Sequence, residues 1–114
     1  MEKDNIFAKM VRGEIPVEKV IETDSLIAIR DIAPQAPVHV LIIPRKGLKN
    51  ISSAADEDKA LLGEMLLAAR DLAKKLGVED GMRLVINEGE EAGQTVPHLH
   101  MHLLAGRSLH WPPG

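Results

Sequence analysis

Histidine and apolar residues alternate along His98-Leu99-His100-Met101-His102-Leu103-Leu104, which predicts a β-strand over residues 98–104. Because successive side chains of a strand point to opposite faces, the three histidines would share one face, at a spacing of about 6 to 7 Å. The apolar side chains would share the other face and pack against the rest of the domain. Three of the five histidines in the chain lie here, so this strand is the first candidate for a functional site.

The rest of the sequence predicts one α+β domain over residues 1–114, with residues 105–114 as a C-terminal tail. Apolar residues at steps of three and four predict a long central helix over residues 56–76. Asp4 is placed to cap a short N-terminal helix that ends at Val11. Four more strands are predicted at residues 17–22, 26–31, 38–43 and 82–87. Together these elements give a five-stranded, mostly antiparallel sheet with the long helix on one face.

The composition narrows the class of protein. The formal net charge is -3 and the charges are interspersed, so the chain has no basic stripe for a long nucleic acid. It has no cysteine, which excludes a disulfide framework and thiolate chemistry. No apolar stretch approaches the roughly 20 residues that span a bilayer, and the N-terminus lacks the pattern of a secretion signal. We therefore predict a cytoplasmic protein with no membrane partner.

The histidine pattern has three interpretations. In the first, the histidines are the solvent-facing side of an edge strand. In the second, they bind zinc, although His98 and His102 would lie roughly 13 Å apart along the strand, too far to share one ion. In the third, they act at phosphorus, because a neutral imidazole is a nucleophile near pH 7 and flanking imidazoles bind phosphoryl oxygens or protonate a leaving group.

Two nearby segments offer groups that bind nucleotides. The loop from Asn87 to Thr95 carries a side-chain amide, a hydroxyl and glycines that expose backbone N–H groups, although it lacks the Gly-Lys-Ser/Thr signature of a Walker loop. The alternative interpretation of this segment is an ordinary hairpin loop that contains glycine. Asp31 ends a predicted strand, where its carboxylate either caps a turn or accepts both hydroxyls of a ribose.

These residues resemble the histidine triad (HIT) superfamily, and within it the Hint branch. The run His98-x-His100-x-His102, followed by two apolar residues, carries the resemblance. The likeness extends over nearly the whole chain, because further segments match in the same order: Asp4-Asn5-Ile6-Phe7, residues 31–37, His39, Ile43-Pro44, Asn87-Glu88-Gly89, Gly93-Gln94 and His110-Trp111-Pro112-Pro113-Gly114.

The resemblance implies a fold, an assembly and an activity. It implies a homodimer whose two sheets join into one ten-stranded sheet. It also implies hydrolysis of purine nucleoside 5′-phosphoramidates, which are conjugates of AMP or GMP with an amine, without a metal or other cofactor. The expected ligand is a purine nucleoside monophosphate or phosphoramidate. Two alternatives remain: a catalytically slow nucleotide-binding module that regulates or scaffolds a partner, and a zinc-dependent hydrolase.

The resemblance also assigns residue roles by matching position. His100 would be the nucleophile that forms a transient nucleotidyl-histidine, with its second ring nitrogen held by the carbonyl of His98. His102 would contact the phosphate and the leaving group, and His39 would support the site from the neighbouring strand. The implied substrate-binding residues are Asp31 at the ribose, Ile32 at the base, Asn87, Gly93, Gln94 and Thr95 at the phosphate or leaving group, and Trp111, which would reach the site of the partner subunit.

Three positions bear on how far the resemblance transfers. Thr95 stands where many Hint proteins have serine, and it keeps the hydroxyl. Pro97 stands where an aromatic residue is common, and because proline has no N–H, an unpaired strand start is expected there. His102 stands where the nucleotidyltransferase branch usually has glutamine, which favours water as the final acceptor.

Overall fold

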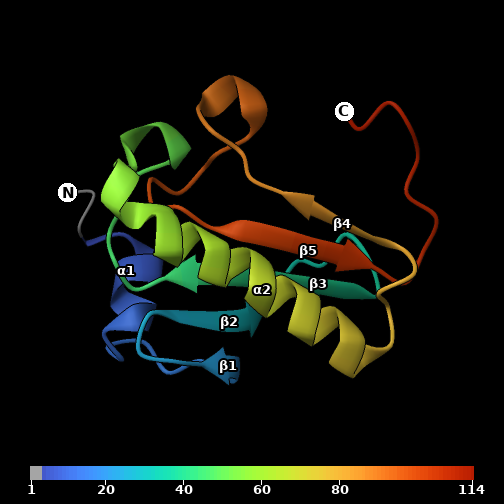
Figure 1. Cartoon of the computed structure of the whole chain (residues 1–114), viewed down its shortest axis with the longest axis horizontal. Helices are drawn as coiled ribbons and strands as arrows, with labels where there is room; N and C mark the ends of the chain where they lie inside the picture. The colour runs from blue at the N-terminus through green and yellow to red at the C-terminus, as the bar shows by residue number, and fades with distance from the viewer. Residues whose placement is uncertain (1–3) are drawn as a thin grey trace.

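Five strands form a single antiparallel sheet in the computed structural model, which describes residues 4–114 (Figure 1). The strand order is β1-β2-β3-β5-β4, so the third and fifth strands of the chain lie side by side. The bounds are β1 Lys19–Glu22, β2 Leu26–Arg30, β3 Val38–Pro44, β4 Met82–Val85 and β5 Met101–Ala105, with helices α1 Ile6–Val11 and α2 Lys59–Leu76. The predicted fold class is therefore confirmed.

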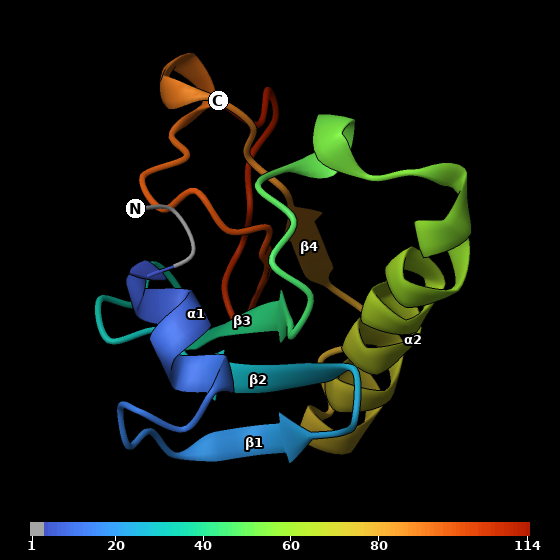
Figure 2. The same ribbon diagram turned by 90° about the vertical axis from the view of Figure 1, so that its left-hand side faces the viewer.

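The two helices cover opposite faces of the sheet (Figure 2). Alternating side chains of each strand serve the two faces, as the pleat requires. The α2 face holds the larger core, with Ala28, Val40, Ile42 and Leu103 packed against Met65, Ala69 and Leu72 of the helix. The α1 face holds a smaller core of Phe7, Met10, Ile27, Ile29, Leu41 and Ile43. A functional site on the α1 face would therefore be supported by the core between the sheet and α2 on the other face.

The helix starts differ from the sequence prediction. Asn5, not Asp4, caps α1, because its side-chain oxygen accepts the N–H of Ala8 at 2.8 Å. The long helix begins at Lys59, after a 3-10 turn over residues 56–58, and it ends as predicted at Gly77 in the left-handed conformation. Within residues 4–114, no helix is both long enough and apolar enough to cross a membrane.

Strand β5 starts at Met101, so the prediction of a strand from residue 98 is wrong at its beginning. Continuing the β3–β5 register would place Leu99 opposite Pro44, which has no N–H to donate. The N–H of Leu99 instead donates to the carbonyl of Leu48 at 2.7 Å, outside the ladder. His98 and His100 therefore lie on the segment that leads into the strand, and only His102 lies within it.

Candidate functional site

Four histidines gather on the α1 face, where β3 and β5 are neighbours. His102 lies opposite Leu41, and His39 lies opposite Leu104 in the same ladder. His39, His98 and His100 are buried, and the side chain of His102 is half-buried. The interpretation of these histidines as a solvated edge is therefore wrong, because β5 is an inner strand and most of the imidazole surface is covered.

His100 is held in one ring tautomer by the backbone. Its Nδ1–H donates to the carbonyl of His98 at 2.7 Å, the contact that the resemblance implies. Because a neutral imidazole carries one proton, Nε2 keeps its lone pair. Burial lowers the pKa of His100, although the bond to the His98 carbonyl opposes this shift. The ring is therefore neutral at neutral pH, with an unprotonated Nε2.

Phe7 fixes the orientation of the buried rings. Its ring meets His100 edge-on, with centroids 4.7 Å apart and planes at 66°. It also meets His98, with centroids 6.3 Å apart and planes at 88°. Helix α1 thus reaches the histidine cluster through its one aromatic side chain, and such edge-to-face pairs add stability beyond the buried area.

The imidazole of His98 has a structural contact. It is 2% exposed, and its Nε2–H donates to the carbonyl of Pro44 at 2.9 Å. Burial lowers the pKa of His98, with the Pro44 carbonyl opposing the shift. The ring therefore joins the segment before β5 to the end of β3, while the His98 carbonyl supports His100.

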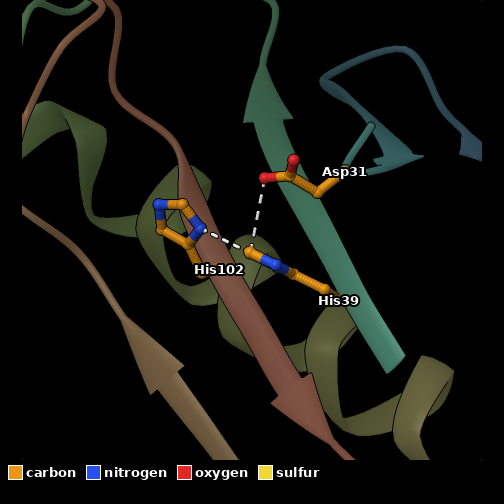
Figure 3. A group of neighbouring side chains, drawn as sticks. All are labelled: Asp31, His39 and His102. Atoms are coloured by element: carbon orange, nitrogen blue, oxygen red, sulfur yellow. Dashed lines mark hydrogen bonds and ion pairs between the residues drawn. The ribbon is translucent and has the colours of Figure 1, made fainter. Parts of the chain in front are cut away.

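His102 of β5, His39 of β3 and Asp31 at the end of β2 form a row of polar contacts (Figure 3). Nε2 of His39 lies 2.9 Å from Nδ1 of His102 and 3.4 Å from Oδ2 of Asp31. Burial first, and then the neighbouring His100 and His39, lower the pKa of His102 to about 4. The free protein therefore keeps His102 neutral at neutral pH, because its pKa lies well below the ordinary histidine value of about 6.5.

The proton positions on His39 and His102 follow from a contact with the backbone. Nδ1 of His39 accepts the N–H of Gln35 at 3.0 Å, so the neutral ring carries its proton on Nε2. That Nε2–H then donates to Nδ1 of His102, which leaves the His102 proton on Nε2. Figure 3 shows this second nitrogen of His102 on the side of the ring turned away from His39.

Asp31, His39 and His102 are also the described residues that could best surround a metal ion, because one ligand atom of each lies within 4.8 Å of the others. The hydrogen bond from Gln35 argues against this use. A metal on Nε2 of His39 requires the ring proton on Nδ1, where it would face the N–H of Gln35. The donor set therefore suits proton exchange better than zinc.

Asp31 follows the last residue of β2 and begins a tight loop. Its Oδ1 accepts the N–H of Ala33 at 2.8 Å, while its Oδ2 faces His39. The next residue, Ile32, is 99% exposed. The Asp31 carboxylate, which keeps lone pairs for a ligand, therefore lies beside the exposed side chain of Ile32 and next to the histidines.

The loop over residues 88–95 is held by hydrogen bonds within itself and to residues 49–52. The side-chain amide of Gln94 is used internally, because Oε1 accepts the N–H of Gly89 at 3.0 Å and Nε2 donates to the carbonyl of Lys49 at 2.8 Å. Glu88 accepts both the N–H and the hydroxyl of Ser52. In the free protein the Gln94 side chain therefore holds the loop together, and its contact with the phosphate or leaving group stays a prediction.

Among the remaining predicted loop residues, Thr95 borders a hollow of about 650 Å³, whereas Asn87 and Gly93 are not among its lining residues. Thr95 lines it and is exposed, and Asn87 is half-buried near Gly93, where an added Cβ would meet Nδ2 of Asn87 at 4.0 Å. The lining of this hollow consists of Lys49, Gly89, Glu90, Gln94, Thr95 and Pro97 and contains no histidine. The hollow is therefore formed by the loop and its neighbouring residues, not by the histidine cluster.

The C-terminal tail is anchored at its backbone and exposed at its tip. Arg83 of β4 donates to the carbonyl of His110 at 2.8 Å. Trp111 is 81% exposed, so the lone tryptophan has no part in the core of the domain.

Sequence reasoning missed three contributors to the site: the Phe7 ring, the N–H of Gln35 and the carbonyl of Pro44. The sequence analysis gives Phe7 no role at the site, although its place in the matching Asp4-Asn5-Ile6-Phe7 segment is a signal for one. The two backbone groups carry no side-chain signal, because any residue type offers the same N–H or carbonyl.

The fold and the cluster define a class of protein: a five-stranded antiparallel sheet with α-helices on both faces and a cluster of histidines where the inner strands β3 and β5 are neighbours. Residues 12–109 match the HIT domain, and the chain belongs to the HIT domain family.

Relatives support this assignment over the full chain. The chain is 55% identical over 114 residues, covering 100% of both sequences, to an uncharacterized HIT-like protein of Synechocystis sp.. It is similar in structure to a HIT family hydrolase from Legionella pneumophila, with a TM-score of 0.93 and 47% identity over 96% of this chain and 98% of the other. A histidine triad nucleotide-binding protein from Candida albicans gives a TM-score of 0.81 and 33% identity over 96% and 83%.

Proposed function

We propose that this protein hydrolyses the P–N bond of purine nucleoside 5′-phosphoramidates, with His100 as the nucleophile, as expected for the Hint branch. The observation that carries the proposal is the hydrogen bond from Nδ1 of His100 to the His98 carbonyl, which leaves Nε2 as a neutral nucleophile. The HIT family hydrolase from Legionella and the nucleotide-binding protein from Candida support a nucleotide substrate and hydrolytic chemistry.

The reaction runs in two displacements. In the first, Nε2 of His100 forms a bond to phosphorus, the P–N bond of the substrate breaks, and the amine leaves with one added proton from solvent, while the Nε2–H of neutral His102 donates to a phosphoryl oxygen. In the second, water attacks phosphorus, the bond to His100 breaks, and one proton of the water returns to solvent. The covalent intermediate divides one difficult substitution into two easier ones, and the His98 carbonyl stabilises the positive charge that develops on the His100 ring.

His102 stays neutral while it contacts the phosphate. Burial holds the pKa of His102 at about 4 in the free protein. A proton on Nδ1 of His102 would face the Nε2–H of His39, because the two nitrogens are 2.9 Å apart. The contact between the two rings therefore also disfavours the charged form and keeps the His102 proton on Nε2.

The nucleoside is assigned to the segment that follows β2. We propose that the Asp31 carboxylate accepts the ribose hydroxyls and that Ile32, which is 99% exposed, covers one face of the purine. Thr95 and Asn87 are proposed to bind the phosphate or the leaving amine from the opposite side.

We also propose the homodimer. Strand β4 pairs with β5 on one side and is open on the other, so a second copy paired at the open edge would extend the sheet to ten strands and bring the exposed Trp111 of one copy toward the site of the other. Light scattering behind size-exclusion chromatography should give the mass of two chains. A monomeric mass at micromolar concentration would contradict the dimer.

The activity is tested by release of nucleoside monophosphate from an adenosine phosphoramidate, with excess chelator present. The wild type should turn over, and His100→Ala and His100→Asn should abolish turnover while retaining measurable binding of the nucleoside monophosphate. Turnover by either variant would remove the nucleophile assignment. Tight binding without turnover by the wild type would favour the nucleotide-binding module, and chelator-sensitive turnover would favour the zinc hydrolase.

A further inference from the structure

The start of the C-terminal tail is docked on the loop that precedes β3. Gly106 has φ +94°, and a Cβ added there would lie 2.9 Å from Cβ of Pro37. Only glycine fits this close approach without a shift of one of the two segments. The next residue, Arg107, donates from Nε to the carbonyl of Gln35 at 2.9 Å and from Nη1 to the carbonyl of Ser108 at 2.8 Å.

The backbone of Gln35 is therefore held on both sides. Its carbonyl accepts Arg107, and its N–H donates to Nδ1 of His39 at 3.0 Å. Its side-chain amide donates to the carbonyl of Ala33 at 3.0 Å, which closes the loop locally. A guanidinium on the tail is thus connected to the histidine cluster through one residue of main chain.

This connection determines which nitrogen of His102 faces the substrate. With the N–H of Gln35 on Nδ1, the proton of His39 is on Nε2 and points at Nδ1 of His102, 2.9 Å away. If Gln35 moved, His39 could carry its proton on Nδ1 instead, and its bare Nε2 would then draw the His102 proton to Nδ1. In that arrangement the outward nitrogen of His102 would have no proton to donate to a phosphoryl oxygen.

We propose that Arg107 is a positioning residue that, through the Gln35 backbone, fixes the ring tautomer of His39 and so directs the Nε2–H of His102 toward the substrate. The catalytic consequence rests on the proposed phosphoramidate hydrolysis, whereas the tautomer assignment does not. Arg107 itself is exposed and makes its contacts to main-chain carbonyls, so it acts on the histidines through the backbone of Gln35 and not by direct contact.

The test compares Arg107→Met, which removes the donors at similar length, with Arg107→Lys, which keeps one donor. Arg70→Met is the matched control, because Arg70 is also exposed and pairs only with its neighbour Asp71 on α2, the opposite face of the sheet. Gly106→Ala provides a second way to displace the tail, through the close contact with Pro37.

The first readout is the set of ¹⁵N resonances of the histidine rings, which distinguishes the two tautomers without substrate. Wild type and Arg70→Met should show His39 and His102 protonated on Nε2, and Arg107→Met and Gly106→Ala should show both rings partly protonated on Nδ1. A wild-type His39 protonated on Nδ1 would overturn the proposal, and so would unchanged tautomers in folded Arg107→Met and Gly106→Ala.

The second readout is turnover of the adenosine phosphoramidate. Arg107→Met should lower kcat by about tenfold with KM within about twofold, and Arg107→Lys should recover most of the loss, in line with the usual effect of removing a residue that orients a ligating or catalytic histidine. A loss confined to KM would overturn the positioning role. If the wild type does not turn over, the proposed function fails, and the ring resonances still decide the tautomer assignment.

Discussion

Acidification should destabilise this protein through His102. The pKa of His102 is about 4 in the folded protein, because burial and then the neighbouring His100 and His39 disfavour its charged form, against an ordinary value of 6.5. Between these values the unfolded chain binds a proton that the folded chain does not. The free energy of unfolding should therefore fall as the pH drops from about 6.5 toward 4, and this group should have no effect above that range.

The size of the effect follows from the two pKa values. At about 1.4 kcal/mol for each pH unit between 6.5 and about 4, His102 accounts for at most about 3.5 kcal/mol. The pKa values of His98 and His100 are lowered as well, which adds to the loss in the same direction. For a domain with a typical free energy of unfolding of about 5–15 kcal/mol, this is a measurable fraction.

Urea unfolding at constant ionic strength, over pH values from about 7.5 to about 4.5, measures this dependence. His102→Gln should have a flatter profile than the wild type, because glutamine does not titrate. His110→Gln removes an exposed histidine outside the cluster and should follow the wild-type profile. Parallel profiles for His102→Gln and the wild type would refute the reasoning, since the destabilisation would then come from other groups.

Three further perturbations address the cap, the aromatic contact and the ribose contact. Asn5→Ala should cost about 1 kcal/mol in urea unfolding and Asp4→Ala much less, because Asn5 is the cap of α1; a larger loss for Asp4→Ala would reverse that assignment. Phe7→Ala should cost about 3 kcal/mol and lower kcat, whereas unchanged stability would remove its packing role. Asp31→Ala should weaken binding of a ribonucleotide more than of its 2′-deoxy analogue by calorimetry, and equal losses would count against ribose recognition.

Some expectations failed at element boundaries for a physical reason. The alternation of residues 98–104 is correct in burial, because Leu99, Met101 and Leu103 all enter the α2 core, yet the ladder starts only at Met101. A periodic pattern reports which face a side chain occupies, whereas the ladder also needs a partner with a free N–H. Pro44, far away in sequence, removes that partner.

The sequence by itself determined the α+β class, the helix and strand positions to within a few residues, and the family, because apolar periodicity and the histidine run are local properties of the chain. Only the tertiary structure decided which nitrogen of each imidazole carries the proton. His100, His39 and His102 have the same side chain, and they differ because a backbone carbonyl, a backbone N–H and another ring reach them from distant segments. Those contacts depend on β3 and β5 lying side by side, and the pKa of His102 depends on how deeply that pairing buries it.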